Sequence, residues 1–92
     1  MTHDQAEMVA IQALGWLAGD DTLFPDFLGT TGADAADLRS RAADPAFLAE
    51  VLAFVTADDA RIIAFCDSTG LGYDLPLRAR YALPGQAEVS WT

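Results

Sequence analysis

Residues that begin and end helices recur at short intervals along this chain, and they constrain its fold more than any other feature. Asp44-Pro45 is the clearest helix start. An aspartate at this position accepts hydrogen bonds from first-turn amides, and a proline already has the helical φ at the first helical position. Gly70 follows an apolar segment, at the position where helices commonly end in the left-handed conformation. Signals spaced this closely predict short helices.

Apolar periodicity between these signals predicts six helices. They are His3–Ala18, Asp20 to Leu28, a weak one from Asp34, Ala46–Val55, Asp58 to Thr69, and a last one that Asp74 and Pro76 introduce and that continues over Leu77 to Leu83. Gly29 is expected to end the second helix. No run of alternating β-branched residues is bounded by turn residues, so no sheet is predicted.

Short connections between helices favour packing of sequential neighbours against each other. The predicted fold class is therefore all-α: a compact orthogonal array of five to six short helices. Residues 1–92 are expected to form a single helical domain, with 85–92 as a flexible tail.

The segment Ala46–Val55 contains one charged residue, Glu50. Its large apolar side chains form two stripes at helical spacing, one of Phe47, Val51 and Phe54 and the other of Leu48, Leu52 and Val55. A helix that is apolar on two sides is covered by more than one neighbour. This helix is therefore predicted to be central.

The charge balance restricts the partners of the chain. Fourteen acidic residues against five basic ones give a formal net charge of −9, which repels a nucleic-acid backbone and an anionic lipid surface. Nucleic acid and membrane are thus unfavourable partners, whereas a basic protein would be attracted. The longest uncharged stretch, Met8 to Gly19, is shorter than the about 20 residues of a membrane span. With one cysteine, Cys66, and no intramolecular disulfide, a cytoplasmic location is expected.

No set of residues suited to catalysis is evident. The single histidine, His3, has no companion for a metal or acid-base site, and Cys66 lacks the further cysteines of a zinc or iron–sulfur site. The pairs Asp20-Asp21 and Asp58-Asp59 stand where helix N-termini favour negative charge. We therefore expect no enzyme activity, no cofactor and no metal, and we expect Cys66 to be a buried thiol.

A possible partner-binding face lies on the first helix. At about 100° per residue, Val9, Gln12 and Trp16 lie opposite Ala10, Leu14 and Leu17. One interpretation is that this helix packs on two neighbours and buries Trp16. The other is that Trp16 anchors a partner, because tryptophan is favoured where a partner completes its burial. The second interpretation predicts a non-enzymatic protein-protein interaction module that binds an unknown protein or itself.

A helix-turn-helix-like transcriptional regulator is the alternative, since the fourth and fifth helices meet tightly around Thr56-Ala57. Its recognition helix would bring Asp58 and Asp59 towards phosphates and would offer only Arg61 to read bases. Charge therefore argues against this alternative.

The order of residues also resembles a domain-of-unknown-function family of small bacterial, chiefly alphaproteobacterial, helical proteins. The resemblance covers about residues 5 to 85 and rests on Ala10, Leu14, Trp16-Leu17-Ala18, Phe27-Leu28, Thr31-Gly32, Asp37-Leu38-Arg39, Asp44-Pro45-Ala46-Phe47-Leu48-Ala49, Val51-Leu52-Ala53-Phe54, Asp58-Asp59, Gly70-Leu71 and Ala82-Leu83-Pro84-Gly85. It implies a helical domain and carries no activity, cofactor or binding residue. The chain departs from the family pattern at Asp74-Leu75-Pro76-Leu77, which leaves the start of the last helix open.

Overall fold

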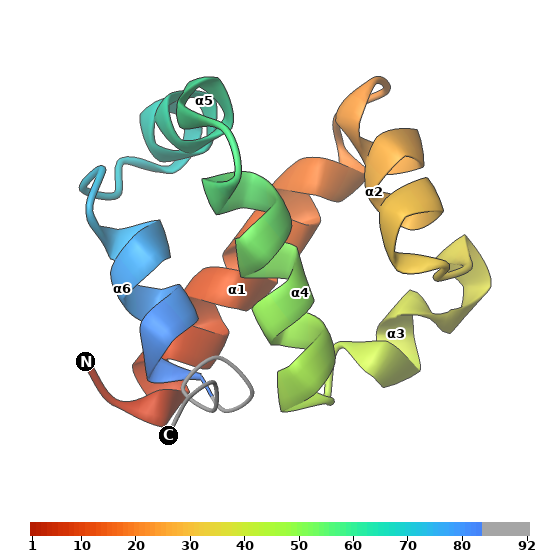
Figure 1. The fold of residues 1–92 in the computed structure, drawn as a ribbon, viewed down its shortest axis with the longest axis horizontal. Helices are drawn as coiled ribbons and strands as arrows, with labels where there is room; N and C mark the ends of the chain where they lie inside the picture. Colours follow the sequence, from red (N-terminus) through yellow and green to blue (C-terminus); the bar gives the residue numbers. More distant parts are fainter. Residues whose placement is uncertain (84–92) are drawn as a thin grey trace.

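The computed structural model describes residues 1–83, which form helices joined by short turns (Figure 1). The helices are α1 (His3–Ala18), α2 (Leu23–Thr31), the 3-10 turn η1 (Ala35–Asp37), α3 (Leu38–Arg41), α4 (Pro45–Thr56), α5 (Asp59–Thr69) and α6 (Leu75–Ala82). Residues 1–83 contain no strand, so the all-α prediction is confirmed. The predicted tail, 85–92, lies outside the described residues.

Helix starts follow the capping chemistry of the sequence. Thr2 and Gln5 form a reciprocal capping box at the start of α1, with hydrogen bonds of 3.0 and 3.1 Å between each backbone N–H and the other side chain. The carboxylate of Asp44 accepts from the amide of Ala46 at 3.0 Å, and Asp58 caps α5 in the same way at 2.9 Å. The predicted start of α4 is thus confirmed.

Two central helices organise the array. α1 and α4 contact each other and cross near the middle of the molecule (Figure 1). α6 packs on both of them, while α2 and α5 pack on α4. α2, α5 and α6 therefore each contact α1 or α4. This arrangement matches the orthogonal array that the short connections predict.

The core is densest around α4, whose two apolar stripes are both buried. Phe27 of α2 is fully buried against this helix. Its ring meets the rings of Phe47 and Phe54 edge to face, with 5.7 and 5.4 Å between centroids. The central position predicted for this helix is confirmed, and Phe27 fixes α2 alongside it.

The end of α2 differs from the prediction. Gly29 does not stop the helix, which continues to Thr31 and ends at Gly32 in the left-handed conformation, φ 73°. The amide of Gly32 donates to the carbonyl of Leu28 at 2.9 Å, which closes the last turn. A glycine can occupy a helix interior at a modest cost, and here the core contact of Phe27 holds the helix together beyond Gly29.

The last helix begins at Leu75, after the N-cap Asp74, within the segment where the sequence leaves its start open. It packs on α1 and α4 through its small residues, so that Pro76 and Ala79 are buried, together with Leu83 just after it. The apolar pair Leu77 and Tyr81 lies on the outer side, 41% and 63% exposed. Spacing alone does not distinguish a close-packed face of small residues from a face of large ones.

Candidate functional site

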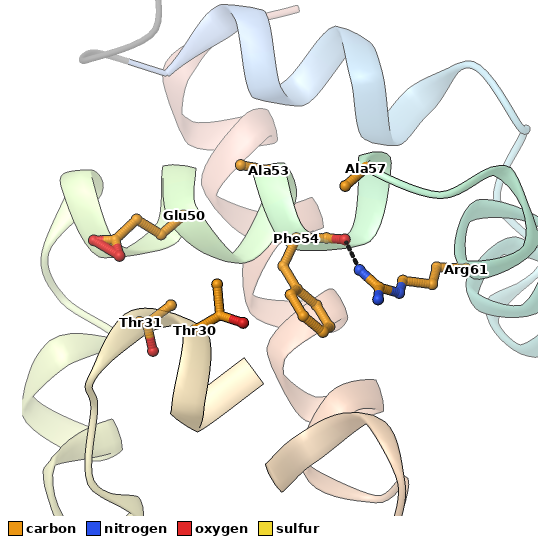
Figure 2. A pocket seen from close by; sticks show the side chains of 7 residues that line it. All are labelled: Thr30, Thr31, Glu50, Ala53, Phe54, Ala57 and Arg61. Carbon is orange, nitrogen blue, oxygen red and sulfur yellow. Dashed lines mark hydrogen bonds between the residues drawn. The ribbon is translucent and has the colours of Figure 1, made fainter. Parts of the chain in front are cut away.

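A groove between α2 and α4 is the first candidate site (Figure 2). We call it the α2–α4 groove; its volume is about 370 Å³, and its lining residues are Thr30, Thr31, Glu50, Ala53, Phe54, Ala57 and Arg61. The groove exists because Phe27 docks α2 on α4, which places Thr30 and Thr31 about one turn further along, facing α4. It has a carboxylate, a guanidinium and an apolar surface between them.

Arg61 is held at one end of this groove by two contacts to a single residue. Its Nη1 donates to the carbonyl oxygen of Phe54 at 2.8 Å, and its guanidinium carbon lies 4.0 Å from the centroid of the Phe54 ring. The carbonyl belongs to the last turn of α4, where main-chain acceptors lack helical partners. Arg61 therefore caps α4 and stacks on it at once.

A second arginine reaches the same helix end from α6. Nη1 of Arg80 donates to the hydroxyl of Thr56 at 3.2 Å, and that hydroxyl donates to the carbonyl of Leu52 at 2.7 Å. No basic residue stands in the last turn of α4 itself. α5 and α6 thus supply the positive charge that the carboxyl end of α4 attracts.

Glu50 stands at the opposite end of the α2–α4 groove (Figure 2). It is exposed, and among residues 1–83 no hydrogen bond or ion pair involves its carboxylate. The hydroxyl of Thr31 is already engaged, donating to the carbonyl of Phe27 at 2.9 Å. Glu50 and Arg61 are therefore the two charged groups that a ligand in this groove would meet.

A second hollow lies between α1 and α3. We call it the α1–α3 groove; its volume is about 420 Å³, and its lining residues are Ile11, Leu14, Gly15, Ala18, Ala35, Leu38, Arg39 and Ala42. Met8 stands one turn before Ile11 on α1 and is not part of this lining. Met8 is 66% and Ile11 49% exposed. Large apolar side chains are thus open to solvent next to the groove.

Acidic residues surround the α1–α3 groove in the sequence. Asp4 stands one turn before Met8 on α1, and Glu7 one turn before Ile11. The remaining acids near this groove follow Ala18 or accompany Ala35 and Leu38; they are Asp20, Asp21, Asp34 and Asp37. Arg39 is the one basic residue in its lining. The segments that form this groove thus carry more acidic than basic residues.

The structure does not place the three predicted binding residues on one open face. Val9 is buried, with 7% of its surface exposed, because α1 has neighbours on more than one side. Val9 therefore offers little surface to a partner, and the partner-binding role of the three residues stays a prediction. Gln12 is exposed and lies next to Ile11, while Trp16 is half-buried against the core. Of the three, Gln12 alone adjoins the exposed apolar stripe of α1.

Cys66 and Tyr73 are the titratable groups whose environment is clearly altered. The thiol of Cys66 is buried and lies 3.5 Å from the carbonyl oxygen of Gly72, as a donor. Burial, followed by the charges of Asp67 and Asp74, raises the pKa of the Cys66 thiol. The burial predicted for Cys66 is confirmed, and a raised pKa lowers the fraction of reactive thiolate.

Among residues 1–83, no three His, Cys, Asp or Glu side chains converge closely enough to hold a metal ion. Within the same residues, no helix combines the length and the hydropathy required to cross a bilayer.

The comparisons with known proteins point to a family without a described function. A family model described as "Protein of unknown function (DUF3572)" matches residues 3–86. The chain belongs to this family. No curated protein and no solved structure matches it.

Membership in DUF3572 confirms the resemblance found in the sequence and adds no site residue, since the family has no described function. Both grooves are thus read from this chain alone. Sequence reasoning did not assemble either of them, although the solitary charge of Glu50 within the apolar α4 segment was a signal for the α2–α4 groove. No feature of the sequence indicates that Met8 and Ile11 are exposed, because hydrophobic periodicity does not show how many neighbours a helix has.

Proposed function

We propose that this member of DUF3572 is a non-enzymatic protein-binding domain, and that its partner presents an amphipathic helix with a basic polar face to the α1–α3 groove. The observation that carries the proposal is the exposed apolar pair of α1, with Ile11 in the lining of that groove and Met8 one turn before it. Apolar surface of this kind, bordered by polar residues, is typical of protein interaction sites.

Charge selects the partner. The segments that line the groove have six acidic residues close by in the sequence, against Arg39 in the lining and Arg41 next to Ala42. Lysines and arginines flanking an apolar helix face would complement this arrangement. A second copy of the chain is a poorer partner, because it would bring the same negative surround against itself and carries the same net charge of −9.

The length of the apolar stripe on α1, from Met8 to Ala18, fits a short helix. Met8 to Ala18 covers ten residue steps of α1, about 15 Å along the axis, which corresponds to about three helical turns. Helix-in-groove recognition uses anchors spaced three and four residues apart, and Gly15 leaves room for a close approach at the middle of the stripe, since no atom lies within 4 Å of a Cβ built there.

The test uses a fluorescent synthetic helix of leucine and lysine in amphipathic order, with a leucine and glutamate version as the charge control. We expect the lysine peptide to bind and the glutamate peptide not to bind, in fluorescence anisotropy at low salt. Ile11→Ser should weaken binding about tenfold, because it removes apolar contact area without adding charge.

The matched control is Ile63→Ser. Ile63 of α5 is 48% exposed, against 49% for Ile11, but does not line the α1–α3 groove. If Ile63→Ser weakens binding as much as Ile11→Ser, or if Ile11→Ser has no effect, the proposed site is wrong. Sedimentation of the free chain tests the competing occupant, and a dimer abolished by Ile11→Ser would identify the partner as a second copy.

The helix-turn-helix regulator stays an untested prediction that no observation favours. Arg61, the basic residue of α5, is turned back onto Phe54 instead of projecting from the helix. Asp58 and Asp59 stand exposed at the start of α5.

A further inference from the structure

The α2–α4 groove is a second surface, since it shares no lining residue with the α1–α3 groove. Its two charged side chains have opposite signs and stand at opposite ends of the α4 surface, with Phe54 between them (Figure 2). Ala53 and Ala57 keep the α4 side of the groove shallow and apolar. A ligand lying along this groove would meet a negative group, an apolar surface and a positive group in turn.

The backbone positions that anchor the two charged groups lie about one turn apart on α4. Glu50 precedes Phe54 by one turn, which is about 6 Å along the axis. Arg61 is fixed at Phe54 by its hydrogen bond to the carbonyl oxygen and by its place over the ring. A guanidinium has several N–H donors in a planar fork, so Arg61 retains donors for a carboxylate while Nη1 holds the helix end.

Charge decides between the classes of small ligand. A simple anion would bind at Arg61 against the net charge of −9. A simple cation would pair with Glu50 but would leave its other end beside the guanidinium of Arg61. A neutral zwitterion meets both charges favourably.

We propose that the α2–α4 groove binds a zwitterion whose ammonium and carboxylate groups are separated by a hydrocarbon chain. The ammonium pairs with Glu50, the carboxylate pairs with Arg61, and the chain lies over Ala53 and Phe54. Free lysine, through its side-chain ammonium and its carboxylate, and the C-terminal lysine of a peptide share this chemistry.

The probe is 6-aminohexanoate, followed by NMR chemical-shift titration of the full chain. Hexylamine keeps only the positive end and hexanoate only the negative end. We expect 6-aminohexanoate to bind at least about fivefold more tightly than either. Equal binding of hexylamine or hexanoate would overturn the proposal.

Glu50→Gln should remove the advantage of 6-aminohexanoate over hexanoate. Glu50 is exposed and caps no helix, so this variant is expected to fold. The matched control, Asp59→Asn, also removes one exposed carboxylate, but Asp59 lies outside the α2–α4 groove and should leave the advantage unchanged. An unchanged advantage in Glu50→Gln, or an equal loss in Asp59→Asn, would contradict the site.

Two further ligands separate the natural sources. A short peptide ending in lysine that binds, while its C-terminal amide does not, identifies a protein C-terminus as the ligand. Binding of free lysine without binding of the peptide identifies a free amino acid. If the peptide, free lysine and 6-aminohexanoate all fail to bind, the proposal is refuted. That result leaves the peptide-helix test of the α1–α3 groove unaffected.

Discussion

The indole ring of Trp16 lies against the phenyl ring of Phe65, with 5.7 Å between the centroids and 55° between the planes. Phe65 is fully buried, and Trp16 is half-buried at the edge of the core. Aromatic pairs at this distance and tilt contribute beyond the area that they bury. Trp16 therefore links α1 to α5, and we interpret it as a packing residue.

Replacing Trp16 by alanine tests this interpretation. We expect Trp16→Ala to lower the free energy of unfolding by about 2 kcal/mol in urea denaturation followed by circular dichroism, less than for a fully buried tryptophan because Trp16 is only partly buried. Gln12→Ala, an exposed position on the same helix, should change it by less than about 0.5 kcal/mol. Equal effects of the two variants would favour the partner-anchor interpretation of Trp16 instead.

Two adjacent aspartates before α2 provide a matched test of capping. Oδ1 of Asp20 accepts from the amides of Thr22 and Leu23 at 2.9 and 2.8 Å. Asp21 is exposed and makes no such hydrogen bond. Asp20→Ala should lower the free energy of unfolding by about 1 kcal/mol, whereas Asp21→Ala should leave it within about 0.5 kcal/mol. Thermal melts of both variants check this, and similar losses would show that charge, not hydrogen bonding, matters here.

Opposite effects are expected for alanine at two glycines of α2. Gly29 lies inside the helix with no atom within 4 Å of an added Cβ, so Gly29→Ala should raise the free energy of unfolding by about 0.5 to 1 kcal/mol. Gly32 has a φ of 73°, so Gly32→Ala should lower the free energy of unfolding by about 1 kcal/mol. The sign of each change in urea denaturation is the test. A stabilising Gly32→Ala would contradict the left-handed end of the helix.

The phenol of Tyr73 should titrate late. Its hydroxyl donates to Oδ1 of Asp67 at 2.6 Å, and this hydrogen bond, followed by the charge of Asp67, raises the pKa of Tyr73 above its ordinary 10.0. Because the fold favours the neutral phenol, this contact stabilises the folded protein below pH 10.0. The stabilisation is lost as the pH rises through the raised pKa of Tyr73.

Ultraviolet absorbance of tyrosinate measures this pKa. Tyr81→Phe leaves Tyr73 as the only tyrosine of the chain. In that background, Asp67→Asn should lower the pKa of Tyr73 towards 10.0. The control is Asp59→Asn, whose carboxylate is not a partner of Tyr73. A pKa that does not fall in Asp67→Asn would show that the hydrogen bond is absent in solution.

Local chemistry accounts for the parts of the fold that were predictable. The caps at Thr2, Asp44 and Asp58 depend on residues within three positions of each helix start, so the sequence displays them directly. The end of α2 depends instead on the distant contact of Phe27 with α4, and Gly29 was therefore misread. Propensity at one position is weaker than packing against another element.

The candidate sites were less predictable, because each needs residues from separate helices. The Val9, Gln12 and Trp16 face came from one helical wheel, which cannot show that α4 and α6 both pack on α1. From the sequence, Arg61 is only a possible residue for base recognition. Its contact with Phe54 joins residues seven positions apart across a turn. Which arginine meets which carbonyl depends on how α5 folds back on α4.

The packing of α6 on α1 has a consequence for how the protein is made. During synthesis, α1 leaves the ribosome long before α6, and Ala6, Ala10 and Leu17, which are fully buried in the finished fold, lack their complete surroundings in that interval. Native structure should therefore appear late, after release of the residues up to Leu83, instead of growing helix by helix. Nascent chains arrested earlier should remain sensitive to protease.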